Sequence, residues 1–364
     1  MALQFDAAAT SGFVPEETKQ ALMAYLAHPA NPARGTYPAS LQASRIVYQS
    51  RKAVADFFGV PKADHVVFTS GITESLNAVL KSLVKKGDRV VCSVYEHNSV
   101  LRVLYAIGVE MLVWDGRLDS LEELLEKDAS LMVCTHVSNV TGEILDIHAA
   151  HGLCRQKGIP FVVDTAQSAG ILDVSMEDMD ILCFTGHKGL HGLQGIGGFC
   201  MKDEALFPSF KQGGTGTHSM NLEQPQNWPE IYEAGTLNVP GILSLKTGIE
   251  FVKRYPAPDY ANLRQELMDA LSDISGIYYL QDPTMHHIGI LSFVIEGVSG
   301  AWLSDQLAAR YGIQTRYGAH CAPLVHQKHG VEASLRLSFG HDVTREQIEF
   351  VAACIHELVR EKRA

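Results

Sequence analysis

The chain has 364 residues, and its 41 acidic and 30 basic side chains give a formal net charge of −11. With 46% hydrophobic and 20% charged residues it has the composition of a globular protein, and its length favours two domains. The acidic balance argues against nucleic acid or an anionic membrane as a main partner, and no apolar run approaches the length of a membrane span.

The cysteine pattern points to a reducing compartment. Cysteines are scattered along the chain, most of them inside apolar runs, and no Cys-x-x-Cys pair occurs, so neither a zinc site nor a disulfide framework is expected. The first residues also lack the basic and apolar segments of a signal peptide, and we expect a cytoplasmic protein. The seven cysteines are Cys92, Cys134, Cys154, Cys183, Cys200, Cys321 and Cys354.

The first two thirds of the chain have the pattern of an α/β domain. An extended segment over 1–14 precedes helices expected over 15–27 and 40–59. Short apolar strands then alternate with helical segments, which predicts a mainly parallel, seven-stranded sheet sandwiched by helices. These segments are 65–69, 73–86, 89–93, 98–107, 110–114, 118–127, 131–135, 148–157, 160–164, 180–184 and 196–201.

The last third changes character. Residues 211–240 are rich in Gly, Thr, Asn and Pro and are too long for an idle connection. A helix follows over 242–253, then the proline-rich linker 255–258. The pattern beyond it predicts a smaller α+β domain, so we expect a large domain over 15–254 and a small one formed by 1–14 with 255–364. The later segments are helices at 259–272, 300–311 and 343–361 and strands at 277–280, 288–295 and 334–338.

Lys188 lies just beyond the expected strand 180–184, in a glycine-rich stretch with few other charges. Open α/β sheets bind ligands at the carboxyl ends of their strands. Partial desolvation in such a place lowers the pKa of a lysine, so that its neutral, imine-forming amine becomes available. The alternative is a lysine on a surface glycine loop.

Asp164 stands 24 residues earlier and closes the apolar strand 160–164. A carboxylate at the end of a buried strand is costly without a cationic partner. The protonated ring nitrogen of pyridoxal phosphate is such a partner, and a lysine holds the aldehyde of that cofactor. Taken alone, Asp164 is also compatible with a helix cap or a metal ligand, but together with Lys188 it favours pyridoxal phosphate.

Other strand ends carry polar residues that suit the same cofactor. Thr73 opens a helix after a glycine turn, where amide groups bind anions such as phosphate, although helix capping explains the same pattern. His97 follows the strand 89–93 and is placed to stack on a ring or to pass a proton; the alternative is a surface histidine beside a capping Asn98. Asn139 follows another strand and is placed to hydrogen-bond ring substituents.

Two residues near the C-terminus add a nucleophile and a cation. Cys321 has a histidine before it and Arg316 nearby, which favours thiolate formation, and its loop-like surroundings argue against a buried structural cysteine. Arg336 lies on the opposite face of its strand from the apolar residues, where its planar fork suits a substrate carboxylate. A surface salt bridge is the alternative for Arg336.

These motifs resemble, in order and over nearly the whole chain, the pyridoxal-phosphate enzymes of the class V aminotransferase fold, specifically the cysteine desulfurase and selenocysteine lyase branch. The resemblance implies a pyridoxal-phosphate-dependent transferase of fold type I. The matching segments are Phe5–Thr10, Thr73, Glu96-His97, Ser138-Asn139, Asp164 with Gln167, Thr185 with His187-Lys188, Glu233–Thr236 and His320–Ala322.

The resemblance also implies roles around the cofactor ring. Lys188 would hold the cofactor covalently and later shuttle protons, and Asp164 would pair with the ring nitrogen. Gln167 and Asn139 would contact the ring on its oxygen side. His97 would stack on the ring.

A third set of implied roles concerns the phosphate and the oligomer. Thr73, Thr185 and His187 would hold the phosphate. Gly216 and Thr217 would reach the phosphate of a partner subunit, so the resemblance implies a homodimer with shared active sites.

The remaining implied roles concern the substrate. Arg336 would bind the carboxylate of an amino-acid substrate, beside Asn139, and Cys321 would attack the substrate sulfur. The products are alanine and an enzyme persulfide, used for iron–sulfur or other sulfur transfer, with a sulfur-acceptor protein as a further partner. Ala7, Tyr37 and Ala319 depart from the residues usual in the family, and these positions bear on the substrate pocket.

We therefore expect a cysteine desulfurase. A selenocysteine lyase, another carbon–sulfur lyase or an aminotransferase would have the same cofactor. A cofactor-binding regulatory protein without turnover is a non-enzymatic alternative, against which the intact Lys188, Asp164, Arg336 and Cys321 argue. A nucleotide-dependent α/β enzyme is disfavoured because no Gly-x-Gly-x-x-Gly turn follows the first strand.

Overall fold

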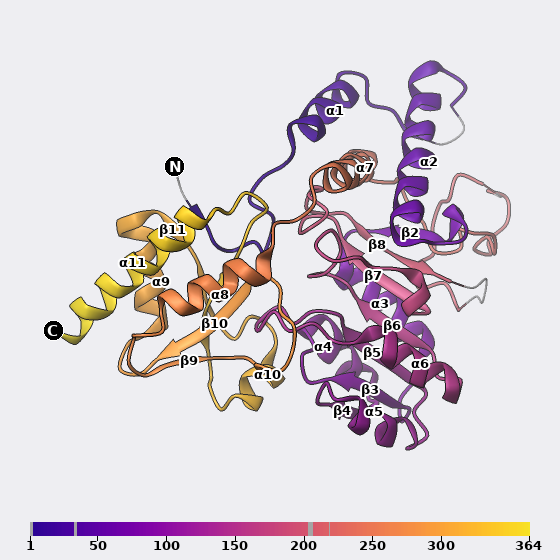
Figure 1. Cartoon of the computed structure of the whole chain (residues 1–364). Helices are drawn as coiled ribbons and strands as arrows, with labels where there is room; N and C mark the ends of the chain where they lie inside the picture. Colours follow the sequence, from indigo (N-terminus) through magenta and orange to yellow (C-terminus); the bar gives the residue numbers. More distant parts are fainter. Residues whose placement is uncertain (1–2, 33–34, 203–206, 218) are drawn as a thin grey trace.

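A seven-stranded sheet forms the centre of the computed structural model, which describes residues 3–32, 35–202, 207–217 and 219–364 (Figure 1). Its strands are parallel except β8, which runs antiparallel to both of its neighbours. This confirms the mainly parallel sheet expected from the sequence. In spatial order the strands are β2 (Val66–Thr69), β8 (Gly197–Met201), β7 (Ile181–Thr185), β6 (Phe161–Asp164), β5 (Leu131–Thr135), β3 (Arg89–Ser93) and β4 (Glu110–Trp114).

Helices cover both faces of this sheet, as its continuous apolar strands require. Alternate strand residues belong to two different apolar clusters, one shared with α3 and α4 and the other with α2, α5, α6 and α7. The sheet is therefore the middle layer of three. These helices, with α1, span Glu16–Ala27 (α1), Pro38–Phe58 (α2), Ile72–Leu83 (α3), Asn98–Ile107 (α4), Leu118–Leu125 (α5), Ile147–Lys157 (α6) and Val239–Arg254 (α7).

The C-terminal third has its own antiparallel sheet and its own apolar cluster (Figure 1). Its order is β12 (Arg316–Gly318), β13 (Ser334–Ser338), β10 (Ile290–Ile295) and β9 (Ile277–Tyr279). A parallel pair joins β1 (Leu3–Gln4) to β11 (Ile313–Gln314), so the start of the chain lies in this region. Its helices are α8 (Tyr260–Ala270), α9 (Gly300–Tyr311), α10 (Pro323–Lys328) and α11 (Arg345–Arg363), and two 3₁₀ turns elsewhere span Ala63–His65 and Met176–Asp178.

The N-terminal segment connects the two sheets. The backbone N–H of Ala8 donates to Ser338 Oγ at 2.9 Å, at the end of β13, and the N–H of Ser11 donates to the carbonyl of His187 at 2.8 Å. The segment therefore runs between the four-stranded sheet and the loop that carries Lys188. The division into domains at 15–254 and at 1–14 with 255–364 stays a prediction.

Two local details differ from the sequence analysis. Helix α10 follows Cys321, where the sequence analysis expected no helix; Pro323 occupies its first turn, where the missing N–H of proline has no cost. His97, not Asn98, caps α4.

No helix or strand lies in the described residues of 211–238. Within the described part of the chain, no helix is long and apolar enough to cross a bilayer.

Two helical glycines test how tightly α7 packs against the loop that follows Lys188. A Cβ added at Gly248 would lie 2.0 Å from the carbonyl oxygen of Leu190, whereas a Cβ at Gly152 in α6 would meet nothing within 4 Å. We expect Gly248→Ala to lower the free energy of unfolding by about 1–3 kcal/mol through overpacking. Gly152→Ala should raise it by about 0.5–1 kcal/mol because alanine is the better helix former. Urea unfolding measures both, and equal effects would contradict the close approach.

Candidate active site

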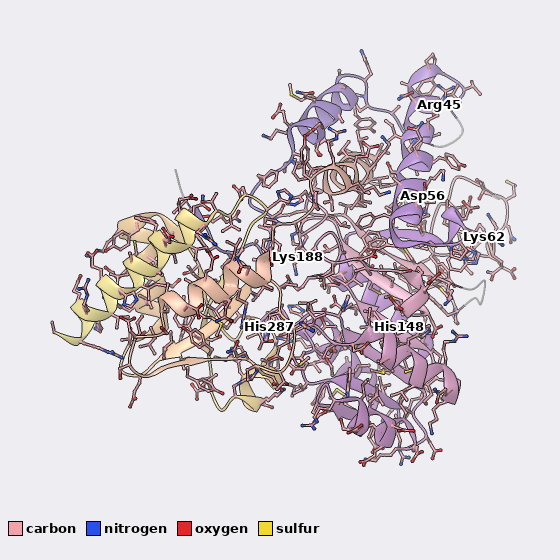
Figure 2. All side chains as sticks on the ribbon, in the orientation of Figure 1. Arg45, Asp56, Lys62, His148, Lys188 and His287 are labelled. Atoms are coloured by element: carbon pink, nitrogen blue, oxygen red, sulfur yellow. The ribbon has the colours of Figure 1, made fainter. Side chains whose placement is uncertain are left out.

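One cavity of about 640 Å³ opens between the carboxyl ends of the parallel strands and the four-stranded sheet. Nine of the eleven residues singled out from the sequence line it. Figure 2 shows Lys188 at the junction of the two regions. The nine residues are Thr73, His97, Asn139, Asp164, Gln167, His187, Lys188, Cys321 and Arg336.

Lys188 and Asp164 face the same cavity from neighbouring parallel strands. Asp164 ends β6 and is only 3% exposed, and Lys188 lies three residues beyond the end of β7. Burial lowers the pKa of Lys188 to about 8, and the Asp164 carboxylate works against this fall. Burial also raises the pKa of Asp164, against the Ala166 N–H and the charge of Lys188. The amine is therefore far easier to deprotonate than an exposed lysine.

The start of α3 offers backbone amides to an anion. Gly71 is the N-cap, and no side chain caps the helix, so its first N–H groups stay available beside Thr73. Thr185, the last residue of β7, is buried behind this turn: its Oγ1 lies 3.9 Å from the position of a Cβ on Gly71. His187 lines the cavity, and its Nδ1 lies 3.1 Å from Thr10 Oγ1.

His97 is fixed by the helix that it caps. Its Nδ1 accepts a hydrogen bond from the N–H of Ser99 at 3.0 Å, which leaves the proton of the neutral ring on Nε2. Burial, together with the positive charges of Lys188, Arg102 and Arg336, lowers the pKa of His97 to about 4. The imidazole is therefore neutral at physiological pH.

Asn139 and Gln167 are held by contacts that cross the molecule. The side-chain amide of Asn139 donates to the carbonyl of His320 at 2.8 Å, and that of Gln167 donates to the carbonyl of Ala8 at 3.0 Å. Asn139 thus ties the edge of the large sheet to the residue before Cys321.

Cys321 is the one exposed cysteine among the seven, all of which lie in the described part of the chain. Both His320 and Cys321 have positive φ, at 49° and 57°, a region that non-glycine residues seldom occupy outside functional sites. The N–H of Asn98 donates to the Cys321 carbonyl at 2.7 Å. Arg316 and Arg336 are close enough to interact with Cys321 electrostatically. Activation of the thiol stays a prediction.

Arg336 is buried, so the surface salt bridge considered for it does not occur. Its Nη1 donates to the carbonyl of Asn139 and its Nη2 to Asp6 Oδ1, both at 2.9 Å, while Nε has no partner among the described residues. Asp6 also accepts from Arg316, which lies directly opposite Arg336 on β12, with a shortest distance of 2.7 Å. Asp6 therefore offsets the repulsion between two facing arginines.

Sequence reasoning missed this role of Asp6. Asp6 and Arg336 are 330 residues apart, and no local pattern in the sequence connects them. The only available signal was an acid in the N-terminal segment that resembles the family motif.

Thr217 lies away from the cavity. With Gly216 it lines a separate hollow of about 620 Å³ beside Arg51, and its role in a partner subunit stays a prediction. Of the three departures from the family pattern, Ala319 lines the main cavity, Ala7 faces a narrower cavity on the other side of Lys188, and Tyr37 is exposed at the start of α2. No cluster suited to a metal ion occurs among the described residues.

The cavity suits pyridoxal phosphate. The buried carboxylate of Asp164 matches a protonated ring nitrogen, the amine of Lys188 matches an aldehyde, and the uncapped start of α3 matches a phosphate. These three groups differ in chemistry and face one cavity.

The chain belongs to the aminotransferase class-V family, whose model matches residues 3–351. Enzymes of this family depend on pyridoxal phosphate. Among curated relatives, a probable cysteine desulfurase of Pyrococcus abyssi is 30% identical, with all of this chain and 95% of the relative covered. A cysteine desulfurase of Escherichia coli O9:H4 is also 30% identical, over 90% of this chain and 86% of the relative.

Solved structures agree with these relatives. The apo cysteine desulfurase of Thermococcus onnurineus NA1 superimposes with a TM-score of 0.89 at 30% identity, covering 99% of this chain and 95% of the other. The cysteine desulfurase CsdA of Escherichia coli gives 0.88 at 26% identity with the same coverage. The sheet order and its covering helices are thus those of a pyridoxal-phosphate enzyme of fold type I.

The pairing of Asp6 with Arg336 can be tested by Asp6→Asn. This change leaves a buried guanidinium without its counter-charge, and we expect the free energy of unfolding to fall by about 2 kcal/mol or more. Asp56→Asn is the matched control, because Asp56 pairs with Lys52 on the exposed surface of α2, and it should change little (Figure 2). Urea unfolding measures both; equal losses would mean that Asp6 has no special role.

Proposed function

We propose that this protein is a cysteine desulfurase, which converts L-cysteine to L-alanine and leaves the sulfur as a persulfide on Cys321. The observation that carries the proposal is the presence of the Lys188–Asp164 pair and the exposed Cys321 in one cavity. The relatives named as cysteine desulfurases support it.

The cofactor would be held as the chemistry of the cavity suggests. Lys188 would bind the aldehyde, Asp164 the ring nitrogen, and His97 the face of the ring. Pyridoxal phosphate, when bound, withdraws electrons from the substrate carbon atoms and makes the carbon–sulfur bond labile. Gln167 and Asn139 would contact the oxygen side of the ring.

The phosphate would lie at the start of α3. The free N–H groups there, with Thr73, Thr185 and His187, supply the donors. Burial lowers the pKa of His187 to about 4, so this histidine contributes hydrogen bonds but no charge at neutral pH. The positive charge at this end therefore comes from the helix dipole.

Arg336 would bind the substrate carboxylate, with Asn139 beside it in the cavity. The Cys321 thiolate would then attack the substrate sulfur. An S–S bond forms, the C–S bond breaks, and its electron pair stays on the substrate carbon, which takes up a proton delivered through Lys188 Nζ. Cysteine and one enzyme thiol thus give alanine and one enzyme persulfide.

The assembly and setting are part of the same proposal. Residues 15–254 would form the cofactor-binding domain, and 1–14 with 255–364 the domain that carries Cys321. Two subunits would share their sites, with Gly216 and Thr217 of each reaching the phosphate of the other. The enzyme would act in the cytoplasm and pass its sulfur to an acceptor protein for iron–sulfur cluster assembly or other sulfur transfer.

Cys321→Ala should abolish persulfide formation from cysteine, leaving less than about 1% of wild-type turnover, because the other six cysteines are buried. Lys188→Ala should remove the absorbance of the covalently bound cofactor as well as turnover. Alanine and persulfide are measured together, with Cys354→Ala as the control in which activity is kept.

The result that would count against the proposal is alanine formation that does not depend on Cys321. A preference for selenocysteine over cysteine in the same assay would point to a selenocysteine lyase.

Shared sites predict complementation between subunits. Lys188→Ala and Thr217→Ala proteins, each weak alone, are unfolded together, refolded and assayed. Half of the dimers will be mixed, and one of the two sites in each mixed dimer keeps both residues, so activity should return to about a quarter of wild type. Activity no greater than the sum of the separate proteins would contradict shared sites.

A further inference from the structure

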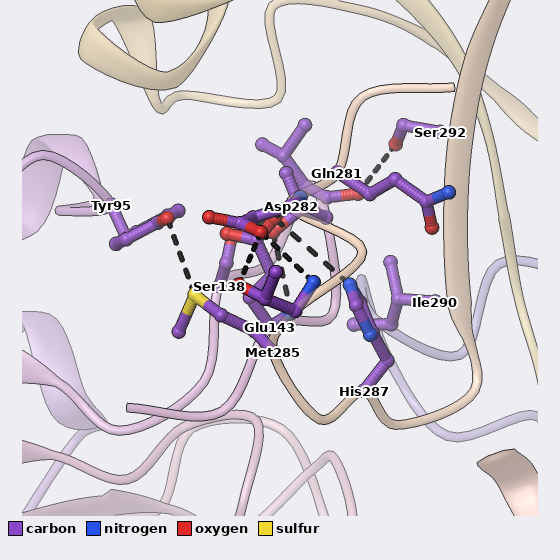
Figure 3. Close-up of polar contacts among 12 residues, drawn as sticks. Tyr95, Ser138, Glu143, Gln281, Asp282, Met285, His287, Ile290 and Ser292 are labelled. Carbon is purple, nitrogen blue, oxygen red and sulfur yellow. Dashed lines mark hydrogen bonds and ion pairs between the residues drawn. The ribbon is translucent and has the colours of Figure 1, made fainter. Parts of the chain in front are cut away.

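The carboxylate of Glu143 lies completely buried in the loop between β5 and α6. Its Oε1 accepts a hydrogen bond from the backbone N–H of Asp282, and Oε2 has no partner of standard geometry among the described residues (Figure 3). Burying a carboxylate with a free oxygen is costly unless the oxygen serves a purpose. None of the roles proposed above uses Glu143.

The phenol of Tyr95 is close enough to this carboxylate to interact with it electrostatically, as is the buried guanidinium of Arg264. Burial raises the pKa of Tyr95, and the charge of Glu143 and hydrogen bonding to it raise it further. The Tyr95 hydroxyl accepts a hydrogen bond from Lys328 Nζ at 2.6 Å, and the same ammonium lies 4.6 Å from the centre of the Tyr95 ring. The hydroxyl also contacts the sulfur of Met285 at 3.7 Å (Figure 3). The phenol thus contacts an ammonium directly and interacts electrostatically with a buried carboxylate.

Each of these three residues belongs to a segment that carries a proposed site residue. Tyr95 stands two residues before His97, and Glu143 stands four residues after Asn139. Lys328 ends α10, the helix that begins two residues after Cys321. None of the three lines the cavity. Outside the cavity, these three residues therefore connect the chain segments that carry His97, Asn139 and Cys321.

The loop of Glu143 is also fixed to the C-terminal sheet. The N–H of Ile144 donates to the carbonyl of His286, and the N–H of Ile288 donates to that of Gly142, both at 2.9 Å. A Cβ at Gly142 would lie 2.8 Å from the carbonyl oxygen of Ile290, so the two backbones are in close contact. His287 Nε2 lies 4.0 Å from Glu143 Oε1 (Figure 3). The loop therefore has little freedom to shift alone.

We propose that Glu143, Tyr95 and Lys328 form a positioning relay that holds the Cys321 segment against His97 and Asn139. The proposal rests on the proposed function, because it assigns the relay to the sulfur-transfer step. The three residues do not touch substrate. Weakening the relay should loosen Cys321 and impair sulfur transfer, while the Lys188 end of the cavity stays intact.

Lys328→Met is the primary test, because Lys328 is an exposed residue and methionine keeps the aliphatic chain. Gln327→Met, at the adjacent exposed position of α10, is the matched control. In cofactor-free protein, iodoacetamide alkylates Cys321 selectively because the other six cysteines are buried. We expect Lys328→Met to speed alkylation of Cys321 by about threefold or more through looser local structure, and Gln327→Met to leave it unchanged.

In the holoenzyme, we expect Lys328→Met to lower kcat for persulfide formation about tenfold, with KM for cysteine and the cofactor absorbance unchanged. A residue with a merely structural role would lower thermal stability without this split. Tyr95→Phe and Glu143→Gln should act in the same direction. The double variant Lys328→Met with Tyr95→Phe should be no worse than the more damaging single variant, because both break one chain of contacts.

Unchanged or slower alkylation of Cys321 in Lys328→Met would overturn the relay, as would fully additive losses in the double variant. If Tyr95→Phe or Glu143→Gln does not fold, the comparison of Cys321 alkylation rates in Lys328→Met and Gln327→Met still tests the relay. A wild-type protein that makes no alanine from cysteine would defeat the proposed function, and with it the assignment to sulfur transfer. The alkylation rates would still show whether the three residues hold Cys321.

Discussion

The burial of Asp164 and Lys188 beside one cavity is the constraint on which the site depends. Burial works on the two groups in opposite directions, raising the pKa of the acid and lowering that of the amine to about 8. The attraction between the two groups limits both pKa shifts. An ionised acid and a readily deprotonated amine can therefore coexist at one buried site. The parallel arrangement of β6 and β7 puts both groups at the same edge of the sheet.

The remaining chemistry comes from a different sheet. Cys321 and Arg336 belong to the C-terminal region, whereas Lys188, Asp164 and His97 belong to the edge of the large sheet. A cavity that is lined by both sheets keeps its shape only if the two sheets keep their relative position. Asn139 lies where they meet: its amide binds the carbonyl before Cys321, and its own carbonyl accepts from Arg336. The N-terminal segment supplies a second link through Ser338 and His187.

The sequence was informative wherever a strand end is followed by an unusual residue. Lys188, Asp164 and His97 could be placed at one edge because apolar runs mark buried parallel strands and their ends converge. Arg336 was assigned to the correct strand, but its pairing with Asp6 was out of reach, since the two lie at opposite ends of the chain.

Local structure near Cys321 was equally hard to foresee. The left-handed backbone at His320 and Cys321 is imposed by contacts with Asn98 and Asn139, not by the residues themselves. Helix α10 is six residues long, too short for periodicity to reveal. Thr217 was assigned by the family resemblance alone, and it lies outside the cavity.

The reversed direction of β8 has a consequence for movement. Because β7 and β8 are antiparallel neighbours, with Thr185 paired to Gly197, both ends of the Lys188 loop are anchored side by side on one sheet. A hinge motion between the large sheet and the C-terminal region therefore cannot displace the Lys188 loop by moving only one of its ends. Any opening or closing of the active site must therefore carry the thiol and the guanidinium past a stationary amine.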